Sequence, residues 1–305
     1  MAQAYASRII DVPVEAVWSV VRDFNALPVW LPAISRSTIE GGLASDVVGC
    51  IRSMYLGEQN VRERLLMLDD SRYSFAYNFE TPAFPVRNYQ AHFELIPVTN
   101  GDRTFAQWTA TFDEAPEDAG KYVQIVSNDV FAAGLRALSD HVRGCKAPEG
   151  AVRWQGYRPA KVFCSSIITG PLETVWARIR DFSAMPDWHP DITRMAMLDG
   201  ARPDKVSAVR DFYFGEGRLN EQLTMLCDTT HTFRYKITLS AMPWLNYHAG
   251  VRLYPITSDN TTFAVWTADW VASPNDDLQL IPTVHNDVFQ KAFDTLNERY
   301  FPRRN

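Results

Sequence analysis

The sequence predicts an α+β protein made of two tandem copies of one domain. Each copy is expected to be a curved antiparallel sheet wrapped around a long C-terminal helix, with two short helices near its start. Three observations predict this fold: the second half repeats the first at a constant spacing, the hydrophobic periodicity changes in the same order in both halves, and the composition is globular. Of the 305 residues, 46% are hydrophobic and 22% are charged, which is ordinary for domains with packed cores.

The repeat is clearest in two 13-residue stretches. Residues 22–34 read RDFNALPVWLPAI and residues 180–192 read RDFSAMPDWHPDI, with eight of the thirteen positions identical. An offset of 158 residues relates the two copies without a gap from Val17 and Val175 to Leu138 and Leu296. Solenoid repeats run at about 20–50 residues, so this period indicates duplication of a whole domain. We expect domains at 1–146 and 160–305 and a linker at 147–159, with a pseudo-dimer as one arrangement open to them.

Each element follows from the periodicity. Residues 5–12 predict a strand, and the segment after Pro13 predicts a short helix with Val14, Val17 and Val21 on its apolar face. A second short helix is expected around Trp30, where prolines interrupt the chain. Alternating segments joined by turns such as DDSR and TNGD predict an antiparallel meander. The final amphipathic helix of each copy would fill the curved sheet.

Composition excludes several classes of function. The net charge of −6 and the lack of a basic run argue against a nucleic-acid partner. No stretch of about 18 apolar residues would span a bilayer, and the first residues do not resemble a secretory signal, so we expect a cytoplasmic protein. The four cysteines show no CxxC spacing, and phosphate-binding glycine loops, GxSxG and HExxH are absent. We therefore expect neither a cofactor nor a metal.

Strand alternation predicts which polar side chains point into the protein. Val61, Glu63 and Leu65 share one face of their segment, whereas Arg62 and Arg64 share the other. The apolar face must turn inward, which takes the glutamate with it. The same reasoning gives one arginine, one glutamate and two tyrosines per copy. These residues are Arg52, Glu63, Tyr77 and Tyr89 in the first copy and Arg210, Glu221, Tyr235 and Tyr247 in the second.

The inward arginine and glutamate admit two interpretations. A buried unpaired charge is costly, so each must meet the other, bound water or a ligand. In one interpretation the two form a structural ion pair. Removing either member would then lower the stability of the fold by roughly 3–5 kcal/mol. In the other they line an apolar pocket and orient the polar groups of a small molecule.

The chain resembles the helix-grip (SRPBCC) superfamily, which includes START domains, polyketide aromatase/cyclases, birch-pollen-type allergens and plant abscisic acid receptors. The resemblance covers almost the whole of each half. It is carried by the strings GCIR (49–52), RERLLMLDDSR (62–72), VRNYQA (86–91) and WTATF (108–112). It implies an apolar cavity for hydrophobic or aromatic ligands between the sheet and the last helix. In the receptors, the positions matching Arg52, Glu63 and Tyr89 belong to the pocket.

Histidines distinguish the second copy from the first. His189 replaces Leu31, His231 replaces Tyr73 and His285 replaces Ser127. An imidazole near an inward glutamate or tyrosine would serve as a general acid or base, while a surface or capping role stays open for each. A zinc site of these three histidines is not expected, because too few other ligands accompany them. Trp30 and Trp188 are interpreted either as gates of the cavity or as core anchors.

We expect a cofactor-independent enzyme of the lyase, dehydratase or cyclase type that acts on a hydrophobic phenolic or polyketide-like molecule. Glu221 or His189 would exchange the proton, Arg210 would stabilise an oxyanion, and Tyr235 and Tyr247 would orient the substrate. The alternative is a non-catalytic carrier, sensor or lipid-transfer protein. The other expected ligand-binding residues are Arg52, Glu63, Tyr77, Tyr89, Trp30, Trp188, His231 and His285.

Overall fold

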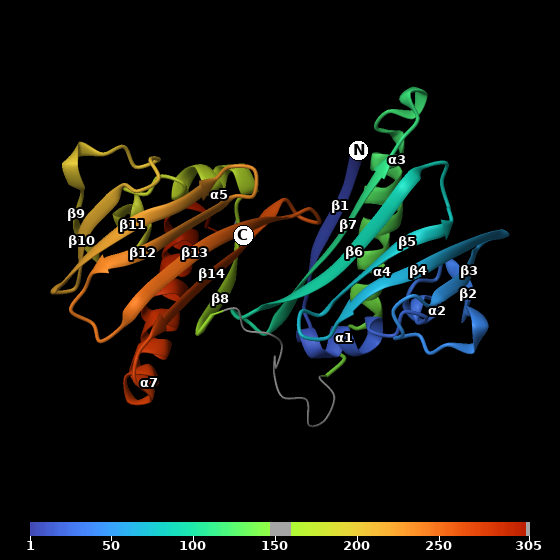
Figure 1. The fold of residues 1–305 in the computed structure, drawn as a ribbon, viewed down its shortest axis with the longest axis horizontal. Helices are drawn as coiled ribbons and strands as arrows, with labels where there is room; N and C mark the ends of the chain where they lie inside the picture. Colours follow the sequence, from blue (N-terminus) through green and yellow to red (C-terminus); the bar gives the residue numbers. More distant parts are fainter. Residues whose placement is uncertain (147–159, 303–305) are drawn as a thin grey trace. The chain divides into compact units, whose positions relative to one another are not determined.

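The structure is a computed structural model that describes residues 1–146 and 160–302. The chain divides into two compact units, one for each copy of the repeat. The expected α+β fold of two tandem helix-grip domains is confirmed (Figure 1). The expected linker at 147–159 lies outside the described residues.

The first domain is a seven-stranded antiparallel sheet in the order β1-β7-β6-β5-β4-β3-β2. After β1 the chain passes through two short helices to the far edge and then returns strand by strand. The strands are β1 (Ala2–Ile10), β2 (Ile34–Ile39), β3 (Ile51–Leu56), β4 (Gln59–Asp69), β5 (Ser74–Thr81), β6 (Arg87–Val98) and β7 (Arg103–Asp113). The helices are α1 (Val14–Val21), α2 (Leu27–Trp30), η1 (Glu40–Gly42), η2 (Pro116–Asp118), α3 (Lys121–Gln124), η3 (Ile125–Ala132) and α4 (Ala133–His141).

The second domain repeats this arrangement in the order β8-β14-β13-β12-β11-β10-β9. Each strand from β2 to β7 begins 158 residues before its counterpart, as Ile34 and Ile192 illustrate. The strands are β8 (Val162–Ile168), β9 (Ile192–Met197), β10 (Val209–Phe214), β11 (Gly217–Cys227), β12 (Thr232–Leu239), β13 (Leu245–Ile256) and β14 (Thr261–Val271). The helices are α5 (Leu172–Ile179), α6 (Met185–Trp188), η4 (Leu198–Gly200), α7 (Pro274–Pro282), η5 (Thr283–Gln290) and α8 (Lys291–Tyr300).

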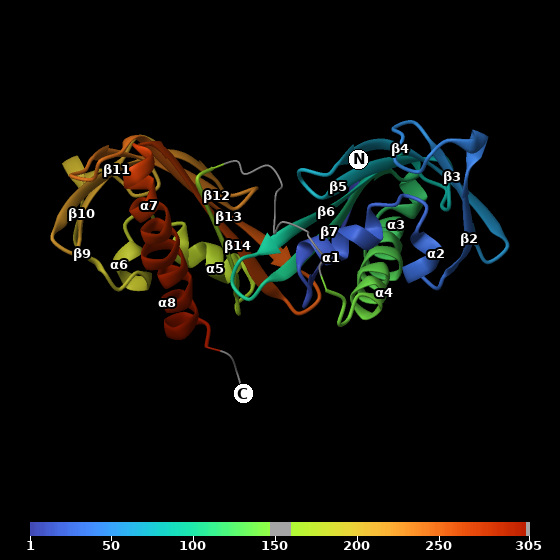
Figure 2. The same ribbon diagram turned by 90° about the horizontal axis from the view of Figure 1, so that it is seen from below.

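In each domain the long C-terminal helix lies along the concave face of the sheet (Figure 2). Its middle part, η3 or η5, is π-helical, which the period of 3.6 residues in the sequence did not predict. Phe131 and Phe289 of these segments stack on Trp108 and Trp266 of the sheet, at centroid distances of 4.7 and 4.2 Å. All four rings are buried, so they join helix to sheet at the centre of each core.

The repeated RDF sequence ties α5 to the sheet. Arg180 donates from Nε and Nη2 to Asp228 after β11, at 2.6 and 2.9 Å, and Trp176 of α5 donates to the same carboxylate at 2.8 Å. The first domain makes the same contacts between Arg22, Trp18 and Asp70. These repeated contacts explain why the arginine occurs in both stretches.

Within the described ranges, no helix is long and apolar enough to cross a membrane.

Candidate functional site

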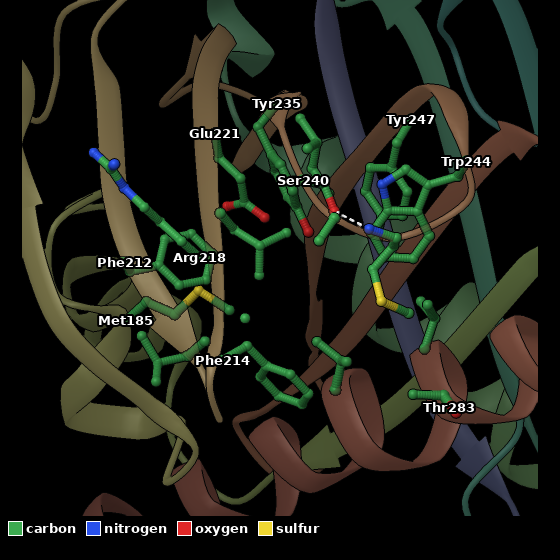
Figure 3. A pocket seen from close by; sticks show the side chains of 18 residues that line it. Met185, Phe212, Phe214, Arg218, Glu221, Tyr235, Ser240, Trp244, Tyr247 and Thr283 are labelled. Carbon is green, nitrogen blue, oxygen red and sulfur yellow. Dashed lines mark hydrogen bonds between the residues drawn. The ribbon is translucent and has the colours of Figure 1, made fainter.

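The second domain contains a cavity of about 110 Å³. It lies between the inner face of β10 to β13, the loop after β12, and the helical segment η5 (Figure 3). Most of its wall is apolar, which is typical of small-molecule sites. The lining residues are Met185, Ile192, Phe212, Phe214, Gly217, Arg218, Leu219, Glu221, Tyr235, Ile237, Ser240, Ala241, Met242, Trp244, Tyr247, Thr283, Val284 and Val288.

Glu221 of β11 forms a buried ion pair with Arg210 of β10. The two residues are directly opposite each other in the strand register, and their exposed fractions are 5% and 1%. Arg210 Nε and Nη2 both donate to Oε2 of the glutamate, at 2.7 and 2.5 Å. The third donor, Nη1, bonds the Phe182 carbonyl at 2.9 Å, and the guanidinium lies 3.8 Å from the centre of that ring. Arg210 is not among the residues that line the cavity, so it contacts Glu221 from the side away from the cavity.

The other carboxylate oxygen of Glu221 is left for the cavity. Oε1 accepts no hydrogen bond from any residue in the described part of the chain, whereas Oε2 accepts two. Figure 3 shows the carboxylate directed into the space that the lining residues enclose. The pairing of β11 with β12 shifts register between Asn220 and Glu221, and such bulges re-aim a side chain. A ligand in the cavity therefore meets a buried carboxylate with one unpaired oxygen.

Burial raises the pKa of Glu221, although the charge and hydrogen bonds of Arg210 act in the opposite direction. A carboxylate whose pKa is raised is a stronger base than one in water once it is ionised. The arginine is what makes an ionised carboxylate tolerable at this depth.

Two tyrosines add hydroxyl groups to the wall near Glu221. The Tyr235 hydroxyl accepts a hydrogen bond from Trp266 Nε1 at 3.1 Å and interacts with the Tyr247 hydroxyl. Burial, with the nearby charge of Glu221 adding to it, raises the pKa of both phenols far above the neutral range. Both hydroxyls therefore keep their protons at pH 7 and are able to donate hydrogen bonds to a ligand.

The first domain repeats the ion pair. Arg52 Nε and Nη2 reach Oε2 of Glu63 at 2.7 and 2.5 Å, and Nη1 donates to the Phe24 carbonyl at 2.6 Å. Tyr77 accepts from Trp108 Nε1 at 3.0 Å. The inward orientation expected from strand alternation is confirmed for all eight polar residues, since each is buried.

His189 lies behind the wall of the cavity. It is fully buried, its ring packs edge-on against Phe214 at 5.6 Å, and Nδ1 accepts from the Asp191 backbone N–H at 3.3 Å. Nε2 is buried, and no residue in the described ranges gives it a hydrogen bond of good geometry. Burial lowers the pKa of His189 to about 4, so the ring is neutral at pH 7.

The remaining residues expected at the site lie away from the cavity wall. His231 Nε2 contacts Glu173 Oε1 at 3.0 Å, and His285 Nδ1 contacts Asn286 Oδ1 at 2.8 Å. Neither histidine is among the lining residues.

Trp30 and Trp188 are both buried. They pack against Trp108 and Trp266, at centroid distances of 6.4 and 5.8 Å. These contacts favour the interpretation of the two residues as core anchors. The described residues contain no group of three or more His, Cys, Asp or Glu side chains arranged for a metal ion.

Strand periodicity did not predict the part played by the loop at 240–244, which contributes Ser240, Ala241, Met242 and Trp244 to the cavity wall. It reads SAMPW, whereas the first copy reads PAFPV at 82–86. A loop has no periodicity from which an inward face is predicted. The differences between the two copies at this loop were the available signal.

Comparisons with known proteins agree with the duplication. The model of the family described as "Polyketide cyclase / dehydrase and lipid transport" matches residues 1–143 and again residues 159–300. The chain is also 31% identical over 102 residues to abscisic acid receptor PYL7 of Arabidopsis thaliana. That match covers 31% of this chain and 47% of the receptor, so it spans about half of the receptor's length.

Two solved structures also match parts or all of this chain. A protein of Thermobifida fusca has 30% sequence identity and a TM-score of 0.43, covering 52% of this chain and 98% of its own. The di-domain aromatase/cyclase BexL of the BE-7585A biosynthetic pathway covers 100% of both chains, with 12% identity and a TM-score of 0.42. Similarities at these levels carry no argument about activity.

Proposed function

Because the chain belongs to the polyketide cyclase / dehydrase and lipid transport family, we propose that its second domain is a cofactor-independent acid–base catalyst for a hydrophobic phenolic or polyketide-like molecule. The proposed reaction is a cyclisation with loss of water. The observation that carries this proposal is the unpaired Oε1 of Glu221 in the wall of an apolar cavity. Proton transfer at a positioned carboxylate of raised pKa is a common way to run such chemistry without a cofactor.

In the first step, Glu221 Oε1 takes a proton from a carbon next to a substrate ketone. The electron pair of the broken C–H bond forms an enolate, whose oxygen accepts a hydrogen bond from the Tyr247 hydroxyl. Tyr235 orients that hydroxyl through its own contact with it. A preorganised donor in a water-poor cavity stabilises developing negative charge more than it would in solution.

In the second step, the enolate carbon attacks a second carbonyl carbon of the same molecule, and a C–C bond closes the ring. The new alkoxide takes the proton back from Glu221. The glutamate then removes the second proton from the same carbon, and the electron pair of that C–H bond forms a C=C bond as the C–OH bond breaks. The hydroxide that leaves takes the proton from Glu221 and departs as water. One molecule of water is lost, and Glu221 returns to its ionised state.

Arg210 acts in this scheme as a positioning residue. All the Arg210 hydrogen bonds in the described part of the chain go to Glu221 Oε2 and to the Phe182 carbonyl, and the arginine does not line the cavity. It therefore aims the carboxylate and lowers the energetic cost of its ionised form. The sequence led us to expect that Arg210 would stabilise an oxyanion. In this proposal the tyrosine hydroxyls do so instead.

The size of the cavity bears on the substrate. About 110 Å³ is comparable to the roughly 150 Å³ of a protein cavity that accepts benzene, and lies below the roughly 300–1,000 Å³ of sites that enclose drug-sized ligands. The enclosed space therefore suits one ring of a substrate. The rest of a larger molecule would extend past the loop at 240–244.

The test is turnover of a panel of phenolic dimers and polyketide-like compounds, followed by mass spectrometry as loss of water. We expect Glu221→Gln to lower the rate about 10²–10⁴-fold, the usual contribution of a general base. Glu63→Gln is the matched variant, since it removes the same charge from the same kind of arginine pair. It should cost similar stability and keep the turnover.

Circular dichroism of both variants shows whether each is folded. Equal loss of turnover in the two folded variants would contradict the assignment to the second domain. Ligand that is retained unchanged, and whose binding is weakened by Glu221→Gln, would instead show a carrier.

A further inference from the structure

Residues 79 and 237 occupy the same position in the two sheets. Phe79 of β5 lies directly opposite Glu63 of β4, and Ile237 of β12 lies directly opposite Glu221 of β11. Direct cross-strand partners share a face of the sheet and are neighbours in space. The side chain at this position therefore borders the carboxylate in each domain, as a phenyl ring in one and a branched alkyl group in the other.

In the first domain the Phe79 ring lies flat against a tyrosine. Its centroid is 3.9 Å from that of Tyr89, with 20° between the ring planes. Phe84 contacts the Phe79 ring at 6.4 Å and extends the cluster to Tyr122 at 6.0 Å. Aromatic side chains thus pack beside the first-domain glutamate.

In the second domain smaller side chains stand at these positions. Ile237 and Met242 replace Phe79 and Phe84, and both line the cavity. The change from Phe79 to Ile237 removes a ring next to the carboxylate. Met242 replaces a second ring at the loop, whereas Trp244 adds one where the first domain has Val86.

Tyr247 keeps one flat partner in the second domain. Trp270 is parallel to it within 8° at 5.6 Å, as Phe112 is to Tyr89 in the first domain at 5.9 Å. Trp244 also contacts Tyr247, at 4.8 Å, but its ring is tilted by 43°. No ring in the described residues reproduces the close, flat contact that Phe79 makes with Tyr89.

We infer that the second domain binds an aromatic ring in the place where the first domain has the Phe79 ring, and that Ile237 makes the room for it. The ring would lie against Tyr247, and the hydroxyl of a phenol would donate a hydrogen bond to Glu221 Oε1, at the place that the C–H bond of the substrate takes in the proposed reaction. The cavity volume of about 110 Å³ suits a single ring. The inference deepens the proposed function, on which it rests, by naming a phenol as the part of the substrate that enters the site.

The test uses 4-fluorophenol as the probe and the full-length chain. Binding is followed by ¹⁹F NMR, and calorimetry gives the number of sites. We expect one site per chain in the wild type. Ile237→Phe should fill the second-domain site and weaken binding at least tenfold. Phe79→Ile should open the first domain and raise the stoichiometry to two.

The control is Leu239→Phe, which adds the same ring to the same strand at an exposed side chain outside the cavity. It should leave the affinity within about twofold of the wild type. Thermal unfolding shows whether each variant is folded. If Ile237→Phe does not fold, Met242→Phe introduces the first-domain residue at the neighbouring position and should weaken binding likewise.

Wild-type affinity in folded Ile237→Phe, or two sites in the wild type, would overturn the inference. Failure of the proposed function is recognised separately. If 4-fluorophenol binds as expected but no compound in the panel is turned over, the catalytic proposal is wrong while the inferred ring site is supported.

Discussion

Glu221 and Arg210 form a pair whose members depend on each other unequally. The arginine keeps two neutral partners, the Phe182 carbonyl and ring, but the glutamate has no other hydrogen-bond donor among the described residues. Removing the arginine takes away the positive charge and the hydrogen bonds that lower the pKa of Glu221. Burial alone then acts on the carboxylate, and burial raises its pKa.

We therefore expect Arg210→Met to lower the free energy of unfolding by about 3–5 kcal/mol at pH 7. The sign of the pH effect follows from linkage. A carboxylate with a raised pKa in the folded state loses stability as the pH rises through that pKa, so the variant should be relatively more stable at pH 5. Urea unfolding at pH 5 and 7 measures both effects.

The double variant Arg210→Met/Glu221→Leu is the control, because an apolar replacement of a whole buried pair is often neutral. It should recover most of the stability. A single variant with wild-type stability at pH 7 would contradict the account of the pair.

His189 predicts a second pH effect. Its pKa is lowered from 6.5 to about 4, chiefly by burial, so the unfolded chain binds its proton first as the pH falls. The contribution of His189 to the free energy of unfolding is therefore fully present above pH 6.5. It is lost as the pH falls towards 4, and the loss from this group is about 3 kcal/mol. His189→Leu copies Leu31 of the first domain and should remove this slope. Denaturant unfolding between pH 7 and 4 compares the variant with the wild type, and an unchanged slope would refute the assignment.

At the scale of elements, strands were predicted better than helices and loops. Alternation assigns each strand residue to a face, so the inward positions of Glu63 and Glu221 followed from their apolar neighbours. The long helix was predicted, but its π-helical segment was not, because one extra residue per turn leaves only a small change in the apolar pattern. The loop at 240–244 has no pattern at all.

The contact between α5 and the end of β11 carries a prediction of its own. The hydrogen bonds from Arg180, followed by that from Trp176, lower the pKa of Asp228 to about 2. A carboxylate whose pKa is lowered in the folded state stabilises the fold at pH values above its usual pKa of 3.8. This stabilisation is lost as the pH falls through about 2. Asp228→Asn should therefore flatten the loss of stability between pH 4 and 2. Acid unfolding followed by circular dichroism measures this, and equal curves for variant and wild type would exclude the carboxylate as the cause.

For the whole molecule, the sequence revealed the duplication but not the difference between its products. The same arginine, glutamate and tyrosines occur in both copies, so counting polar residues does not tell the domains apart. The difference that we propose to matter is the packing of Phe79 in one domain and Ile237 in the other. Its effect depends on which rings meet in three dimensions, and a single sequence does not contain that information.

The second domain carries every lining residue of the cavity, since all of them fall between Met185 and Val288. It also has its own complete sheet and core. Residues 160–305 produced alone should therefore fold and bind 4-fluorophenol with an affinity within about threefold of the full chain. A folded fragment without binding would show that the first domain completes the site.

The most direct test of the central claim is a ¹³C NMR spectrum of the glutamate side-chain carboxyl carbons, recorded with and without 4-fluorophenol. Glu221→Gln and Glu63→Gln assign the two buried resonances. We predict that the Glu221 signal shifts on addition of the phenol while the Glu63 signal stays in place. An unmoved Glu221 signal at saturating phenol, or equal shifts of both signals, would contradict the claim that the bound ring meets the glutamate of the second domain and not that of the first.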